Sequence, residues 1–253
     1  MFQEEFLAAS NAAVKKSELL RKNPAGYFLL SMLAGAFIGF GVLLTNSIGA
    51  QLDGAPYTKL VMGLAFGVAL SLVVMAGAEL FTGNNLVMAA GLIKRKAKFS
   101  EALLLWIVCW LGNLCGAILL GAVYVLTTLP DGAVGIFMAN AAAAKIAPGP
   151  IALLARGALC NMLVCLAVWC GFRIKSDAGK LIMIFWCLFA FITTGFEHSI
   201  ANMTLFTEVL LHPGEAAVSL SGCLYNLLFV TLGNMIGGIV FVAIPYAVSA
   251  KEK

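Results

Sequence analysis

Two short stretches of the sequence place ionisable and amide side chains next to glycine inside otherwise apolar runs. Residues 77–84 and 195–202 share the pattern G-x-E-x-x-x-x-N, and the second stretch also holds His198. Apolar runs of this kind can cross a membrane. An ionisable side chain inside such a run is by default a residue of a solute pathway or a proton relay. His198 is therefore the first candidate for chemistry, and a neutral imidazole hydrogen-bonded in the core is the alternative.

The carboxylates of Glu79 and Glu197 are expected to serve as scaffold, since a bare carboxylate beside an anion path would repel the anion. They could accept hydrogen bonds from backbone N–H groups or hold His198. Three further polar side chains lie in apolar segments: Thr82, Asn84 and Asn161. Each could donate to a passing solute or bridge two helices, and bridging is the more frequent role.

The elements that position these residues follow from composition. Of the 253 residues, 62% are hydrophobic and only 11% are charged, which excludes an ordinary soluble domain. A membrane-spanning helix needs about 20 apolar residues. The apolar segments lie near 27–48, 60–93, 101–126, 151–172, 181–210 and 218–248. The sequence therefore predicts an all-α membrane protein with six transmembrane helices, preceded by an interfacial helix over 2–22.

The basic residues predict the orientation of these spans. If both termini share one side, 13 Lys and Arg fall on that side and three, namely Lys59, Lys145 and Arg156, fall on the other. Because cytoplasmic connections carry the excess of positive charge, both termini are expected to be cytoplasmic. The net charge of +4 forms no patch along the sequence, so nucleic acid is not an expected partner.

The second and fifth segments are too long for one crossing, and each is interrupted by its G-x-E pattern. One span later, Leu111-Gly112-Asn113 is echoed by Leu232-Gly233-Asn234. The chain is expected to form one domain over 1–253 with repeats over about 24–126 and 149–248. Three spans in each repeat make the second copy inverted. Packing kinks at both breaks are the alternative.

Two broken spans at membrane depth are expected to line a cavity, because unpaired backbone there is tolerated only in such places. The half-helices should begin at about Asn84 and near Ser199 and run in opposite directions, with their N-termini at the centre. Two positive dipole ends favour an anion, so the expected solute is small and negative.

The sequence carries no sign of a cofactor or metal site. Seven cysteines lie inside apolar runs without a C-x-x-C pair, and the chain has only two histidines. His198 and Glu197 could act as an acid–base pair of an enzyme, but no nucleophile or cofactor motif accompanies them. A neutral-solute pore of the glycerol or water type would need Asn-Pro-Ala repeats, and neither break contains proline.

Several longer motifs are specific and run over nearly the whole chain in order. They are Ala34–Gly39, Glu79–Gly83, Trp110–Asn113, Gly157–Asn161 and Glu197–Thr204. Through them the chain resembles the formate/nitrite transporters, and within that family the nitrite-channel branch. The resemblance implies an aquaporin-like fold and a homopentamer in a bacterial-type inner membrane, with a pore in each subunit.

The resemblance also implies roles for individual residues. His198, hydrogen-bonded to Thr82, would lie at the pore centre, Lys145 in an outer loop and Asn161 in the fourth span would attract or polarise the anion, and Glu197 and Asn202 would belong to the same pathway. Hydrophobic constrictions would be formed by Phe66, Leu70 and Phe191 on the outer side and by Leu80, Phe81 and Val164 on the inner side. The anion would share a proton at His198, oriented by Thr82 and Glu197, and then cross these rings.

The expected substrates are nitrite, formate and hydrosulfide, which are monovalent conjugate bases of weak acids. The pairing of Glu79 with the Glu197-His198 dipeptide favours nitrite, and a hydrosulfide or formate channel of the same family is the alternative. Both a channel and an anion/proton symporter remain compatible with the residues.

Overall fold

The structure is a computed structural model that describes residues 2–214 and 217–250. Its elements are α1 (Gln3–Lys22), α2 (Pro24–Gln51), α3 (Thr58–Ala65), α4 (Gly67–Ala76), α5 (Phe81–Ile93), α6 (Phe99–Val125), η1 (Leu129–Asp131), α7 (Ala133–Ile146), α8 (Pro150–Arg173), α9 (Asp177–Thr194), α10 (Ser199–Leu211), α11 (Leu220–Gly238), η2 (Ile239–Ala243) and α12 (Ile244–Ser249). The described residues contain no strand, so the prediction of an all-helical protein is confirmed.

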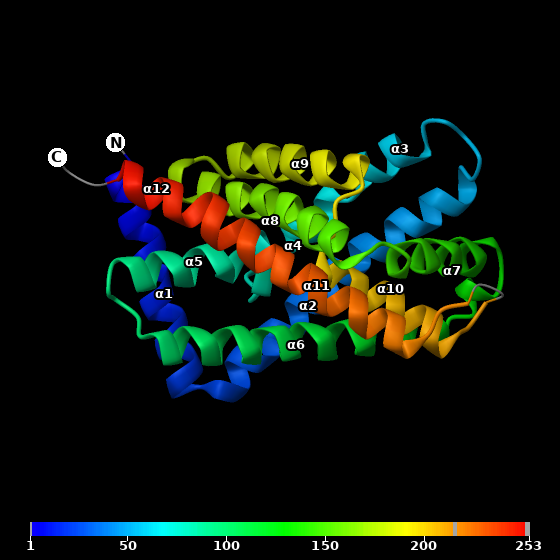
Figure 1. Cartoon of the computed structure of the whole chain (residues 1–253), viewed down its shortest axis with the longest axis horizontal. Helices are drawn as coiled ribbons and strands as arrows, with labels where there is room; N and C mark the ends of the chain where they lie inside the picture. Colours follow the sequence, from blue (N-terminus) through cyan, green and yellow to red (C-terminus); the bar gives the residue numbers. More distant parts are fainter. Residues whose placement is uncertain (1, 215–216, 251–253) are drawn as a thin grey trace.

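Six helical stretches within the described residues are long and apolar enough to cross a membrane. They are α2, α3 with α4, α6, α8, α9 and α11 through α12. The predicted span count is therefore confirmed, and the protein is an integral membrane protein. The spans lie roughly along the long axis of the molecule, with α1 and α12 at one end and α7 at the other (Figure 1).

The second and fifth spans are broken, as the sequence predicts. Helix α4 ends before Gly77 and α9 ends before Gly195, and these two glycines have φ of 81° and 80°. Positive φ at the end of a helix is readily adopted only by glycine, which explains why both patterns begin with this residue. Leu80 and His198 are extended, and α5 and α10 begin directly after them.

The two half-helices extend from the middle of the molecule toward opposite ends. In Figure 1, α5 runs toward the end that holds α1 and α12, and α10 runs toward the end that holds α7. Helix α10 begins at Ser199 as predicted. The expected start of the first half-helix at about Asn84 is wrong, because α5 begins at Phe81, directly after the extended residue Leu80.

Glycine pairs let neighbouring spans pack backbone to backbone within one chain. A Cβ atom at Gly35 of α2 would collide with the Asn113 carbonyl of α6, and one at Gly237 of α11 would collide with the Ala158 carbonyl of α8. The small-residue pairs in the sequence are compatible with contacts inside or between subunits. These two glycines are used inside the subunit, where they bring α2 close to α6 and α11 close to α8.

Candidate functional site

His198 and Thr82 meet where the two broken spans come together. Thr82 Oγ1 lies 3.1 Å from His198 Nε2, and both side chains are buried. The other ring nitrogen, Nδ1, accepts a hydrogen bond from the Ala201 amide at 3.1 Å. Because a backbone amide can only donate, Nδ1 carries no proton in the neutral ring and Nε2 does. The Nε2–H group is therefore directed at the threonine oxygen.

The two asparagines of the repeated L-G-N motif hold the half-helices in place. Asn113 Oδ1 accepts from the Phe81 amide at 3.0 Å, and Asn234 Oδ1 accepts from the Ser199 amide at 3.0 Å. Their Nδ2 groups donate to the carbonyls of Glu79 and Glu197, at 2.9 and 3.0 Å. The first amide of each half-helix is thus occupied by protein. The positive ends of the helix dipoles still point to the centre.

Glu197 belongs to a buried cluster at the α7 end of the molecule. Lys145 Nζ lies 3.0 Å from both carboxylate oxygens, and Asn202 Nδ2 donates to one of them at 2.7 Å. Two expectations are corrected here. Lys145 lies in helix α7 rather than in a loop. The ring of His198 is held by Thr82 and Ala201, while the carboxylate of Glu197 is bonded to Lys145 and Asn202.

Glu79 forms an equivalent cluster at the α1 end. Lys16 Nζ of α1 lies 2.6 Å from both carboxylate oxygens, and Asn84 Nδ2 donates to one of them at 3.0 Å. Each glutamate is therefore bonded to a lysine and to the asparagine five residues further on. Neither carboxylate serves the backbone amides at the break, a role expected from the sequence and filled instead by Asn113 and Asn234.

A cavity of about 620 Å³ opens at the α7 end and reaches the centre of the site. Its lining includes the side of α10 with Ala201, Asn202 and Leu205. The charged residues of the lining are Asp53, Lys59, Lys145, Arg156 and Glu197. Phe66, Phe191 and His198 also line it. We call this cavity the vestibule.

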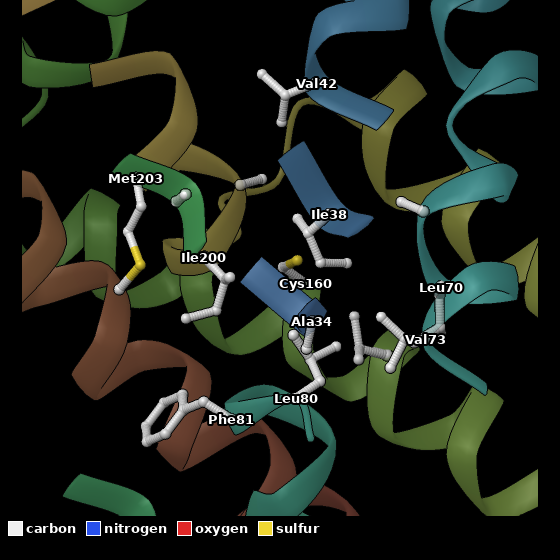
Figure 2. Close-up of a cluster of buried hydrophobic side chains, with 14 of the residues drawn as sticks. Ala34, Ile38, Val42, Leu70, Val73, Leu80, Phe81, Cys160, Ile200 and Met203 are labelled. Atoms are coloured by element: carbon white, nitrogen blue, oxygen red, sulfur yellow. The ribbon is translucent and has the colours of Figure 1, made fainter. Parts of the chain in front are cut away.

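Apolar side chains flank the His198–Thr82 pair. The Phe191 ring stacks on the His198 ring with centroids 5.9 Å apart and contacts the Phe66 ring edge to face at 5.6 Å. The residues expected to form constrictions are all buried: Phe66, Leu70, Phe191, Leu80, Phe81 and Val164. Figure 2 shows Leu80 pointing into the same apolar cluster as Ala34, whereas the Phe81 ring extends in another direction.

Asn161 bridges two helices close to the centre. Its Nδ2 donates to the Thr82 carbonyl at 3.2 Å and to the Asn234 carbonyl at 2.7 Å. Both amide hydrogens are therefore used by backbone, and the buried Oδ1 has no partner among the described residues. The geometry matches the bridging role weighed in the sequence. Direct donation by Asn161 to a solute would require one of these bonds to break.

Lys16, Asn113 and Asn234 belong to the site although the sequence did not point to their roles. No sequence signal pointed to Lys16, because it lies in α1, outside both predicted repeats. Within the described residues, no cluster of three or more His, Cys, Asp or Glu could hold a metal ion. The site thus combines a buried imidazole–hydroxyl pair with apolar neighbours at the inner end of the vestibule.

Known proteins share this architecture. The family model described as formate/nitrite transporter matches residues 3–248. The nitrite transporter NirC of Escherichia coli K12 is 39% identical over 250 residues, which cover 97% of this chain and 91% of NirC. A solved structure titled FNT family ion channel superposes with a TM-score of 0.94 at 36% identity, covering 99% of this chain and 100% of the other. A second solved structure, titled pentameric formate channel with formate bound, superposes with a TM-score of 0.80 at 32% identity. The match covers 90% of this chain and 98% of the other.

Proposed function

Because the chain belongs to the formate/nitrite transporter family, we propose that it carries small monovalent anions of weak acids, above all nitrite, through a pore in each subunit. Transport rather than catalysis is the activity of this family. The observation that carries the proposal is the buried His198–Thr82 contact at the inner end of a vestibule that also contains Lys145.

The passage is apolar on both sides of His198, which makes the charge of the solute decisive. An unpaired anion that leaves water for an apolar ring pays a large desolvation penalty. A protonated weak acid pays far less. The proposed sequence is entry of the anion into the vestibule, hydrogen bonding to the Nε2–H of His198, uptake of a solvent proton and passage of the neutral acid.

Thr82 has a specific part in this sequence. Its oxygen accepts from Nε2–H when the site is empty, so the imidazole donor is not left unpaired in an apolar environment. Its own hydroxyl hydrogen remains available to the solute. When an anion arrives, the threonine hydroxyl and the imidazole N–H can both donate to it.

Oligomerisation and membrane location belong to the same proposal. The solved formate channel to which this chain is similar is titled pentameric, and we propose a homopentamer here as well. The distribution of Lys and Arg supports cytoplasmic termini. The membrane that we propose is the inner membrane of a bacterial cell. The clusters around Glu79 and Glu197 then face the cytoplasm and the outside, respectively.

Formate is the second candidate substrate, because that same solved structure is titled as having formate bound. Nitrite and formate are both bent two-oxygen anions, and the central donors can serve either.

The test is flux into proteoliposomes of the purified protein. Nitrite, formate, hydrosulfide and glycerol are compared by stopped-flow light scattering, with protein-free liposomes as the blank. We expect rapid nitrite and formate flux with little glycerol flux. Flux of glycerol without flux of any of the three anions would overturn the proposal.

A further inference from the structure

The lining of the vestibule contains two cations that do not belong to the His198–Thr82–Lys145 arrangement, Lys59 and Arg156. The ammonium of Lys145 lies 3.0 Å from both oxygens of Glu197, so the pair is neutral when viewed from a distance. An approaching anion is attracted only weakly by a paired cation. The remaining charged groups of the lining are Asp53, Lys59 and Arg156.

Of the two cations, Arg156 lies on the face of α8 that is directed toward the pore. It lies four residues before Cys160 and eight before Val164 on α8, so the three share one helix face. Cys160 points into the central apolar cluster together with Ala34 and Ile38 (Figure 2). Arg156 therefore lies two turns outward from Val164, at the level where the vestibule is lined by α8.

The guanidinium of Arg156 is not neutralised in the way Lys145 is. Over residues 2–214 and 217–250 no carboxylate lies within 4.0 Å of it, and the residue is exposed. Its backbone is nonetheless fixed, because the Arg156 carbonyl accepts from the Glu197 amide at 3.2 Å. The arginine is thus anchored directly beside the second break with its charge free to act on solutes.

At the corresponding position beside the first break, the chain has an uncharged residue. In the first half of the chain, the amide of Glu79 donates to the Leu30 carbonyl of α2 at 3.1 Å, which makes Leu30 the counterpart of Arg156. The Lys–Glu–Asn clusters match at the two ends, as do the two asparagine bridges. Leucine and arginine therefore occupy matched backbone positions beside the two breaks, and this is a chemical difference between the two ends.

We propose that Arg156 is the anion receptor of the vestibule and that it favours two-oxygen anions such as nitrite and formate over hydrosulfide. The inference rests on the proposed function. A guanidinium presents a planar fork of N–H donors that fits two oxygens at once, whereas an ammonium acts as a point charge. An uncompensated cation in a cleft also raises the local concentration of anions and the rate at which they enter.

The test compares variants in proteoliposomes at substrate concentrations far below saturation. Arg156→Gln should lower initial nitrite and formate uptake roughly tenfold at low ionic strength and much less at high ionic strength, where salt screens the charge. Arg156→Lys should keep the salt dependence but lose most of the preference for nitrite over hydrosulfide. At near-saturating substrate, most of the difference in uptake between Arg156→Gln and the wild type should disappear. Arg173→Gln, at the other end of α8, serves as the control.

Several outcomes would overturn the inference. Arg156→Gln with wild-type nitrite uptake at low ionic strength refutes the receptor. An unchanged ratio of nitrite to hydrosulfide uptake in Arg156→Lys refutes the two-oxygen preference. Thermal unfolding of each purified variant verifies folding, and Arg156→Met repeats the test with a different neutral side chain. A wild-type protein that carries no anion would instead defeat the proposed function.

Discussion

Replacing Asn234 with leucine should destabilise the protein strongly and misplace the second half-helix. The side chain is fully buried and makes three hydrogen bonds, to the Ser199 amide at 3.0 Å and to the carbonyls of Gly157 and Glu197 at 2.8 and 3.0 Å. Leucine has a similar volume but cannot form any of them. Three buried backbone groups are left without this partner.

The magnitude follows from these three bonds. Each buried backbone group that loses its partner costs about 1–3 kcal/mol, so the loss is at least about 3 and at most about 9 kcal/mol. For a chain of this length, the lower value corresponds to a fall in the melting temperature of roughly 10 °C. Because the N-terminus of α10 is no longer held, the His198–Thr82 distance should change and nitrite flux should fall as well.

The assay is thermal unfolding of the purified protein in detergent, followed by nitrite flux for variants that remain folded. Thr231→Val is the matched control on the same helix, because Thr231 accepts a single hydrogen bond, from Trp110 Nε1 at 3.2 Å. The Thr231→Val substitution should lower the free energy of unfolding by about 1 kcal/mol. Asn113→Leu should resemble Asn234→Leu. The reasoning is refuted if Asn234→Leu melts no lower than Thr231→Val.

Three further changes test other parts of the site. Thr82→Val should lower nitrite flux about fivefold, the equivalent of one hydrogen bond of about 1 kcal/mol, whereas Thr82→Ser should retain the flux; equal flux in both would contradict the role of the hydroxyl. Lys145→Met should lower stability by about 3 kcal/mol by leaving Glu197 buried without its partner, and adding Glu197→Gln should recover most of the loss in a double-mutant cycle. Glu208→Met should raise the melting temperature by a few degrees, because both buried carboxyl oxygens lack a partner among the described residues; a fall in melting temperature would show that the carboxyl has a partner.

The sequence predicts the breaks because their cause is local. A positive φ at Gly77 and Gly195 needs glycine, and the glutamate two residues after each glycine is costly in lipid. The exact start of α5, in contrast, is determined by a distant residue. The Phe81 amide is held by Asn113, 32 residues away, so the helix can begin three residues before the expected Asn84.

The lysines illustrate where local reasoning fails. Lys16 lies in a polar amphipathic helix with other cations, and only the packing of α1 against α5 brings it to Glu79. For Lys145 a signal was present. The four alanines before it favour a helix, and the structure has one there. Its pairing with Glu197 spans 52 residues and depends on how α7 packs beside α10.

The repeated L-G-N motif was visible as a repeat, but its function was not. Asparagine in a membrane helix commonly bridges helices, and sequence alone does not say which groups it joins. In the structure Asn113 and Asn234 each join the first amide of a half-helix to the carbonyl of the preceding glutamate. The bridge is needed because the break exposes these groups at membrane depth.

The most direct measurement of the central claim is the number of protons that enter a proteoliposome with each nitrite ion. Nitrite uptake and luminal pH are recorded together, with a pH-sensitive dye inside the vesicles and His198→Phe and protein-free liposomes as controls. If the anion crosses the apolar rings as a neutral acid at His198, wild-type uptake should acidify the lumen in proportion to the nitrite that enters and should not respond to a potassium–valinomycin clamp. Nitrite uptake that leaves the luminal pH unchanged and is accelerated by the clamp would contradict the claim. So would a His198→Phe variant whose nitrite uptake and luminal acidification equal those of the wild type.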